Sequence, residues 1–170
     1  MALSVFNWSG GKDSCLALHH ILQNQDFEVK YLLTTVNDAY HRVSMHGVRE
    51  SLLIQQTNSL GIPLHQVRLP EMPDMATYEH EMNQHLMQLK AEGITHAIFG
   101  DLFLADLKAY RESKLAEIGL IAEFPLWNRD TREVLKEFMT IVVNQAADIA
   151  YHSHSTVFEE VTQDTVLHKI

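Results

Sequence analysis

The sequence has 170 residues, of which 46% are hydrophobic and 21% charged, as is typical of one compact globular domain. Its net charge of −9 argues against a general nucleic-acid-binding surface. A single cysteine, Cys15, excludes disulfides within the chain and a zinc site built from several thiolates. Because no apolar run approaches ~18 residues and the N-terminus lacks a signal-peptide pattern, we expect no membrane contact and a cytoplasmic location.

Apolar runs alternate with segments of helical periodicity along the chain. The runs predict strands at Leu3–Trp8, Val29–Thr35, Leu64–Arg68, Ala97–Gly100 and Ile149–Tyr151. The segments between and after them predict helices at Ser14–Gln23, Gly47–Leu60, Met75–Glu92, Asp106–Ile118 and Thr131–Asn144. Strands that alternate with helices are typical of a parallel sheet with right-handed crossovers. The predicted fold class is therefore α/β, with a doubly wound, mainly parallel, Rossmann-like sheet.

The first strand-to-helix turn has the sequence SGGKDS at residues 9–14. Doubly wound sheets bind ligands at the carboxyl ends of their strands, and glycines at such a turn let the backbone approach an anion. Lys12 adds a cation, while Ser9 and Ser14 add hydroxyl donors, so the turn predicts a phosphate site. A Walker loop does not fit, because Phe6 and Asp13 stand where it needs Gly and Ser or Thr; a G-x-G-x-x-G dinucleotide fingerprint is not present.

SGGKDS resembles the PP-loop, S-G-G-x-D-S, of the ATP pyrophosphatases. The resemblance continues, in the expected order, through "LLTTVNDAYHRVSMHGVRESLL", "LGIPL", "EGITHAIFGDLFLADLKAYRESKLAEIGL" and "FPLW". These blocks are similar to the N-type branch that contains diphthine–ammonia ligase and has the HUP, or adenine nucleotide alpha hydrolase-like, fold. The likeness implies a PP-loop ATP-binding domain at residues 1–150 and an atypical tail at residues 151–170.

The resemblance implies an ATP-dependent ligase with ATP and Mg²⁺ as cofactors. An oxygen of an unknown carbonyl or carboxylate acceptor attacks the α-phosphate, pyrophosphate leaves, and ammonia or another amine displaces AMP. The residues carried over as the pyrophosphate-binding loop are Ser9, Gly10, Gly11, Lys12, Asp13 and Ser14. Lys12 is the catalytic candidate, since it would neutralise the departing pyrophosphate. Asp13 could instead simply cap the following helix.

Two later segments carry further candidates. The end of the second predicted strand is expected by its position to meet adenine through its backbone, at Thr34, Thr35 and Val36. The polar segment that follows is interpreted as a loop over the nucleotide or the acceptor, with candidate residues Arg42, Ser44, His46 and Gly47. The alternative is a solvated connection in which Ser44 caps the next helix.

Gly100 and Asp101 fall at the carboxyl end of a predicted strand, on the same sheet edge as the PP-loop. A carboxylate there could hold Mg²⁺ or position the attacking group, so Asp101 is a candidate for catalysis and for metal binding. Gly100 is a candidate for cofactor binding. Capping of the next helix by Asp101 is an alternative compatible with that role. On that helix, Arg111 and Glu112 belong to a segment that resembles the acceptor-side helix of the branch, and are therefore substrate-binding candidates. The alternative is that they form a surface ion pair.

Residues 151–170 resemble nothing in this branch, whose members continue with another strand, further helical residues and an acidic Gly-Glu-rich motif. We therefore expect an intact nucleotide half of the site and an incomplete acceptor half. Three explanations stay open: a shortened natural member, completion of the site by a second subunit in a homodimer, or a relic that binds ATP without turnover. The competing functions are thus an amide-forming ligase and a nucleotide-binding module.

Overall fold

The computed structural model describes residues 1–44 and 47–144. The chain divides into two compact units, Met1–Arg129 and Asp130–Ile170, of which the first contains the sheet. In the second unit, residues 131–144 are helical as expected, and Asp130 caps this helix by accepting hydrogen bonds from the backbone N–H groups of Arg132 and Glu133. The expected boundary at residue 150 and the expected strand at Ile149–Tyr151 lie outside the described residues.

The sheet of the first unit has a mainly parallel order. Its strands are β1 (Ala2–Asn7), β2 (Phe27–Asn37), β3 (Arg42–Val43), β4 (Leu64–Leu69), β5 (His96–Phe99) and β6 (Ile121–Glu123). Leu33 of β2 pairs with Asn7 of β1 on one side and with His65 of β4 on the other. Since β1 also pairs with β5, and β5 with β6, the parallel strands run in the order β4-β2-β1-β5-β6. This is the α/β, HUP-like fold that the sequence predicts.

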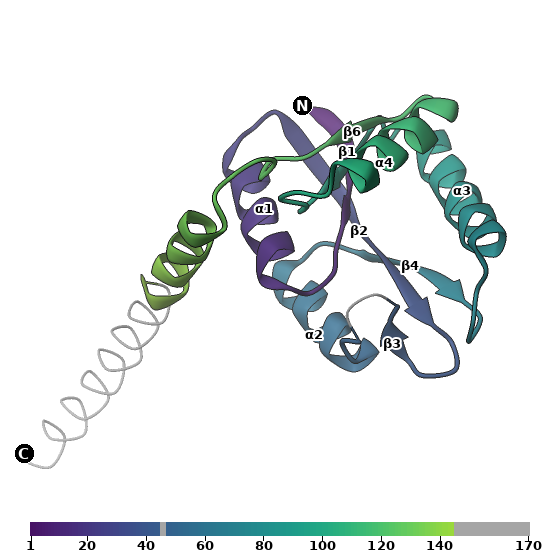
Figure 1. Ribbon diagram of the computed structural model, residues 1–170, viewed down its shortest axis with the longest axis horizontal. Helices are drawn as coiled ribbons and strands as arrows, with labels where there is room; N and C mark the ends of the chain where they lie inside the picture. Colours follow the sequence, from purple (N-terminus) through teal and green to yellow (C-terminus); the bar gives the residue numbers. More distant parts are fainter. Residues whose placement is uncertain (45–46, 145–170) are drawn as a thin grey trace, which may run out of the picture. The chain divides into compact units, whose positions relative to one another are not determined.

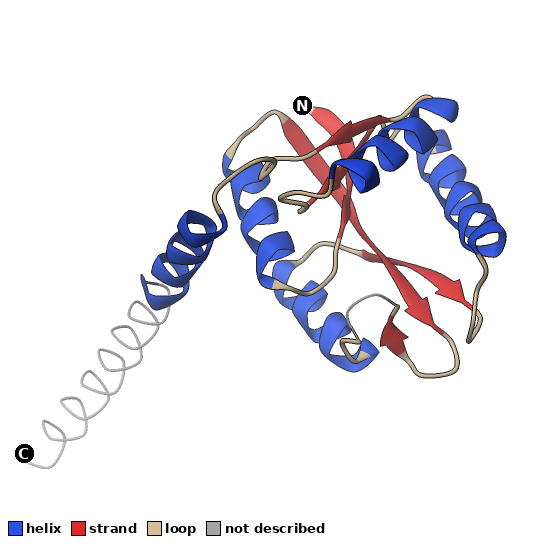
Figure 2. Cartoon of the chain, viewed as in Figure 1, coloured by secondary structure: helices blue, strands red, loops and turns tan. Residues whose placement is uncertain are grey.

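Helices cover both faces of this sheet. They are α1 (Lys12–Gln23), α2 (Glu50–Leu60), α3 (Met75–Ala91) and α4 (Ala105–Glu117). α1 and α2 lie on one side of the sheet and α3 and α4 on the other (Figure 1), and strands and helices alternate along the chain (Figure 2). Three consecutive residues of β1, Ser4, Val5 and Phe6, are fully buried, as a central strand covered on both faces requires. Among the described helices, none is long and apolar enough to cross a membrane.

The structure differs from the sequence-based expectation at two short strands and one helix start. β3 pairs antiparallel with Val36 and Asn37, so the segment expected as a loop begins as a strand. β6 forms a parallel edge beside β5. Strands of two or three residues are too short for an alternating pattern to reveal them. α2 begins at Glu50 rather than at Gly47, whose positive φ of 64° places it outside the helix.

The strand order reverses at β1. From β1 the chain proceeds through α1 to β2 and through α2 to β4, then crosses through α3 to β5 on the opposite side of β1. The connections that leave the carboxyl ends of β1 and β5 therefore diverge, which opens a crevice between them. The PP-loop follows β1, and Gly100 and Asp101 follow β5, so both line this switch point.

Candidate functional site

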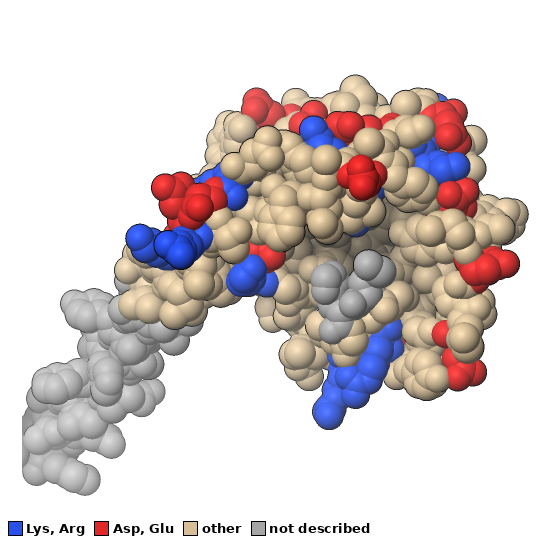
Figure 3. Space-filling model, in the orientation of Figure 1, with Lys and Arg blue, Asp and Glu red and all other residues tan. Residues whose placement is uncertain are grey.

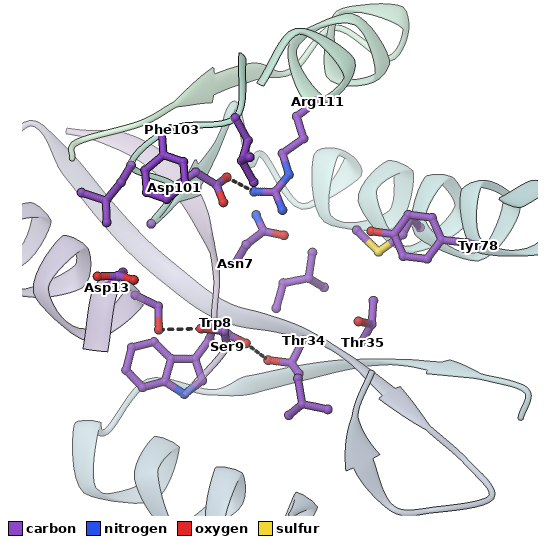
Figure 4. Close-up of a pocket in the computed structure, with 17 residues that line it drawn as sticks. Asn7, Trp8, Ser9, Asp13, Thr34, Thr35, Tyr78, Asp101, Phe103 and Arg111 are labelled. Atoms are coloured by element: carbon purple, nitrogen blue, oxygen red, sulfur yellow. Dashed lines mark hydrogen bonds and ion pairs between the residues drawn. The ribbon is translucent and has the colours of Figure 1, made fainter. Parts of the chain in front are cut away.

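A crevice of about 280 Å³ opens at the carboxyl ends of β1 and β5 (Figure 4). Its walls come from the turn after β1, the end of β2 with β3, the turn after β5, and the facing sides of α3 and α4. The lining residues are Asn7, Trp8, Ser9, Asp13, Ser14, Leu33, Thr34, Thr35, Val43, Tyr78, Met82, Gly100, Asp101, Leu102, Phe103, Leu104 and Arg111. Many of the residues expected in the site thus meet in one cavity, at the place where doubly wound sheets bind ligands.

Hydrogen bonds within the PP-loop hold its two hydroxyl groups together. The Ser9 hydroxyl donates to Ser14 Oγ at 3.0 Å, and the Ser14 hydroxyl donates to the Gly11 carbonyl at 2.9 Å. The Gly11 N–H in turn donates to Ser9 Oγ at 3.3 Å. Gly11 is the N-cap of α1 and has no side chain with which to cap it. The positive end of the α1 dipole is therefore directed at the loop, an arrangement that suits an anion.

Lys12 and Asp13 form an ion pair at the start of α1; Asp13 lines the crevice, whereas Gly10, Gly11 and Lys12 are not among its lining residues. Lys12 Nζ lies 2.7 and 2.8 Å from the two carboxylate oxygens of Asp13. Asp13 lies in the first turn of α1 and does not cap it, since the N-cap is Gly11. The Lys12 side chain is 42% exposed, so its ammonium group is accessible to solvent.

Gly100 allows close packing between the turn after β5 and the start of α1. A Cβ at this position would lie 2.9 Å from Ser14 Cα and 3.0 Å from the Ser14 nitrogen. Both are backbone atoms of the first turn of α1, so any side chain would push that turn away from β5. Glycine here therefore brings the PP-loop and the turn after β5 into contact.

Asp101 and Arg111 pair with each other inside the crevice. Arg111 Nη1 donates to Asp101 Oδ2, and its guanidinium carbon lies 4.3 Å from the centre of the Phe99 ring. Asp101 does not cap α4, whose N-cap is Leu104. Glu112 instead forms an exposed pair with Lys108 at 3.3 Å and is not among the residues that line the crevice.

The end of β2 supplies two of its three candidates to the cavity. Thr34 and Thr35 line it, and the Thr34 hydroxyl donates to the Trp8 carbonyl. Val36 is fully buried and pairs with Val43 on one side and Arg68 on the other, so its side chain belongs to the core.

The segment at residues 42–47 contributes differently from expectation. Arg42 Nη1 donates to the Gly47 carbonyl at 2.6 Å, and both residues are exposed. The Ser44 N–H donates to the Thr35 carbonyl at 3.0 Å, and Ser44 does not cap α2, whose N-cap is Arg49. His46 lies outside the described residues. Of this segment's described part, the residue that lines the crevice is Val43, which was not expected.

Gln56 is a contact of the PP-loop that the sequence analysis missed. It lies on α2, where its Oε1 accepts from Trp8 Nε1 and its Nε2 donates to the Gly10 carbonyl, both at 3.3 Å. Gly10 has a φ of 75°, and a Cβ there would lie 2.8 Å from Gln56 Oε1. Neighbouring residues of a helix point in different directions, so the Gln55-Gln56 pair did not reveal which of the two contacts the loop.

The described carboxylates near the crevice do not form a complete metal-binding cluster by themselves. Among the described residues, no group of three or more His, Cys, Asp and Glu side chains could hold a metal ion. Mg²⁺ is commonly bound through one or two carboxylates together with substrate phosphates. Asp13 and Asp101, which both line the crevice, fit this shared mode of binding.

Comparison with known proteins agrees with this geometry. The profile of the diphthamide synthase N-terminal domain family matches residues 2–122, which is more than two thirds of the chain. The crystal structure of a predicted subunit of tRNA methyltransferase from Methanocaldococcus jannaschii superposes with a TM-score of 0.53 at 15% sequence identity, over 81% of this chain and 75% of that chain. At this identity, the likeness shows the fold alone. No curated protein matches the sequence.

Proposed function

Because the chain belongs to the diphthamide synthase N-terminal domain family, whose members are ATP-dependent ligase domains, we propose that it binds ATP in the crevice and adenylates a carboxylate or carbonyl acceptor. Pyrophosphate leaves, and ammonia or another amine then displaces AMP. The observation that carries this proposal is the PP-loop, in which the paired hydroxyls of Ser9 and Ser14 stand at the open N-terminus of α1.

The crevice offers each part of ATP a suitable surface. The β- and γ-phosphates take the PP-loop, where Lys12 exchanges Asp13 for the leaving pyrophosphate and stabilises its charge. The adenine takes the other end, between the backbone at Thr34 and Thr35 and the apolar side chains of Val43 and Met82. The α-phosphate then faces the turn after β5, where Asp101 lies paired with Arg111 of α4 (Figure 4).

A magnesium ion would be held between the phosphates and Asp13 or Asp101, and would supply electrostatic stabilisation of the departing pyrophosphate. The protein's own contribution is the placement of both carboxylates on the crevice wall. Mg²⁺, the acceptor, the amine, a homodimeric assembly and the cytoplasmic location stay predictions.

Nucleotide binding is tested by calorimetry with AMP and ATP. Replacing Lys12 and Ser14 together by alanine removes one cation and one hydroxyl of the loop, and should weaken ATP binding at least tenfold, about 1.4 kcal/mol. AMP binding should change less, because AMP lacks the β- and γ-phosphates. Ser59→Ala is the matched control, because its exposed hydroxyl donates to the Gln55 carbonyl on α2 and is not among the residues that line the crevice. Equal affinities of the double variant and the unaltered protein would rule out the loop as the phosphate site.

A further inference from the structure

A second cavity, of about 440 Å³, lies between α3 and α4, and we name it the side chamber. It shares four lining residues with the crevice, namely Asn7, Tyr78, Met82 and Arg111, so the two spaces are contiguous. The space-filling view shows a hollow near the middle of the first unit, bordered mostly by residues other than Lys, Arg, Asp and Glu (Figure 3).

The walls of the side chamber are mostly apolar. They include Leu86 of α3, Phe99 at the end of β5, and Leu107, Leu115 and Ile118 of or just after α4. Two methionines, Met75 and Met82, add side chains that adapt to ligands of different shape. An occupant of this space is therefore an apolar group.

The charged groups between α3 and α4 form a paired cluster of two carboxylates and one ammonium. Glu79 accepts a hydrogen bond from the Tyr110 hydroxyl at 2.9 Å and pairs with Lys114 at 3.2 Å. Lys114 also lies 3.7 Å from Glu117. Burial, followed by the hydrogen bond to Glu79, raises the pKa of Tyr110 to about 12, so this residue stays neutral at physiological pH. Two carboxylates and one ammonium leave this group with a net charge of −1, which disfavours an anionic group beside it and directs a carboxylate to the Arg111 end of the chamber.

The junction of the two spaces has a different character. Figure 4 shows Asn7 between Arg111 and Thr34, on the path from the PP-loop to Tyr78. A guanidinium has five N–H donors, so the Arg111 contact with Asp101 leaves capacity for a second carboxylate. The Asn7 amide has two N–H donors, of which one serves the Ile98 carbonyl at 3.2 Å.

We propose that the side chamber holds the apolar tail of the acceptor, which is a carboxylic acid with an aliphatic or aromatic body. This inference rests on the proposed function and specifies its substrate class. With the tail between α3 and α4, the carboxylate lies at the Asn7–Arg111 junction and faces the α-phosphate. One carboxylate oxygen forms a bond to the α-phosphorus, and the bond to pyrophosphate breaks with its electron pair on the leaving oxygen.

Adenine is the other candidate occupant, and the chamber suits it less well. A purine has hydrogen-bonding atoms around its edge, and these would be desolvated among leucine, phenylalanine and isoleucine side chains. The end of β2, in contrast, brings backbone groups to the crevice at Thr34 and Thr35. Occupancy of the chamber by the base is an outcome that the experiment distinguishes.

The test is the exchange of radiolabelled pyrophosphate into ATP, which requires a carboxylate that is reversibly adenylated. Straight-chain acids from acetate to octanoate serve as probes at equal concentration. We expect the exchange rate at subsaturating acid to rise about three- to fourfold per methylene, the fold-change that corresponds to ~0.8 kcal/mol per buried CH₂. AMP affinity is measured in parallel by calorimetry.

A chamber-filling variant makes the test specific. Leu107 is partly buried and lines the chamber but not the crevice, so Leu107→Trp should reduce octanoate-dependent exchange at least tenfold and leave AMP affinity within twofold. Ile118→Phe, just after α4, fills the same space with a smaller change. Ala109→Trp is the control, because Ala109 is an exposed residue of α4 outside both linings, and it should exchange as the unaltered protein does.

The outcomes separate this inference from the proposed function. If the filled variants lose AMP binding while Ala109→Trp keeps it, the chamber belongs to the base and the inference is wrong. It is equally wrong if AMP binds but no acid supports exchange, or if the filled variants exchange normally. If the unaltered protein binds neither ATP nor AMP, the proposed function itself fails.

Discussion

Gln56 connects α2 to the backbone of the PP-loop, although no described residue of α2 lines the crevice. Its side chain accepts a hydrogen bond from Trp8 and donates one to Gly10, on either side of Ser9. The loop therefore does not depend on its glycines alone for its conformation. A side chain from a distant part of the sequence selects one arrangement of a flexible stretch before any ligand binds.

Replacing Gln56 by alanine should weaken ATP binding about fivefold. The change leaves the Gly10 carbonyl and the Trp8 indole without these partners, a loss of about 1 kcal/mol, and the nucleotide must then order the loop itself. Gln55→Ala is the matched control, since Gln55 is the exposed neighbour on the same helix. Calorimetry that gives both variants the same affinity would contradict a positioning role for Gln56.

The sequence could predict the members of the site that sit in a local motif. The PP-loop and the Gly100–Asp101 turn are contiguous strings at strand ends, so their place at one sheet edge follows from the parallel fold. Tyr78 and Gln56 could not be predicted, because each reaches the site from a helix, Tyr78 from the first turn of α3 and Gln56 from the middle of α2. Which face of a helix is turned to a cavity depends on tertiary packing rather than on the residues beside it.

At the scale of elements, α3 meets β4 through a pair of histidines. His65 Nε2 and His85 Nδ1 lie 2.8 Å apart, and the Tyr31 ring packs edge-on against His65. Burial, and then the neighbouring His85, lower the pKa of His65 in the folded protein. The contact is therefore favoured when the His65 ring is neutral, with one ring donating a hydrogen bond to the other.

This lowered pKa predicts that stability falls with acidification. The unfolded chain takes up the proton near its ordinary pKa of about 6.5, whereas folded His65 resists it, so the free energy of unfolding decreases as the pH falls below that value. His65→Gln should reduce this pH dependence, measured by urea unfolding at pH 7.5 and pH 5.5. His80→Gln, which alters an exposed histidine of α3, should retain it. A His65→Gln protein with an unchanged pH dependence would contradict this interpretation.

Helices and strands could be predicted from the sequence wherever a segment was long enough to show a hydrophobic periodicity. All four helices of the sheet unit, and the strands β1, β2, β4 and β5, lie where the pattern predicts them, with shifts at their ends. β3 has two residues and β6 three, which is too few to show an alternation of apolar and polar side chains. Both strands are recognised by their pairing with neighbouring strands. α2 starts later than predicted, because Gly47 has a positive φ and Arg49 is extended, and hydrophobic periodicity encodes neither conformation.

At the scale of the whole molecule, the fold brings chemistry from distant segments to one sheet edge. The reversal of strand order at β1 places the PP-loop beside the turn after β5, and α3 and α4 close the space on the other side. The crevice and the side chamber together give room for a nucleotide and a second substrate. All of their lining residues belong to the unit Met1–Arg129.

The position at which ATP is cleaved tests the central claim most directly. The protein is incubated with ATP, Mg²⁺, ammonium and a small-molecule extract of cells as a source of acceptors, and the phosphorus products are separated by ion-exchange chromatography. The Lys12→Ala, Ser14→Ala double variant serves as the blank. A PP-loop ligase produces AMP and pyrophosphate in equal amounts, at a rate that falls at least tenfold in the blank. ADP and inorganic phosphate as the products, or bound ATP that stays intact, would contradict the account.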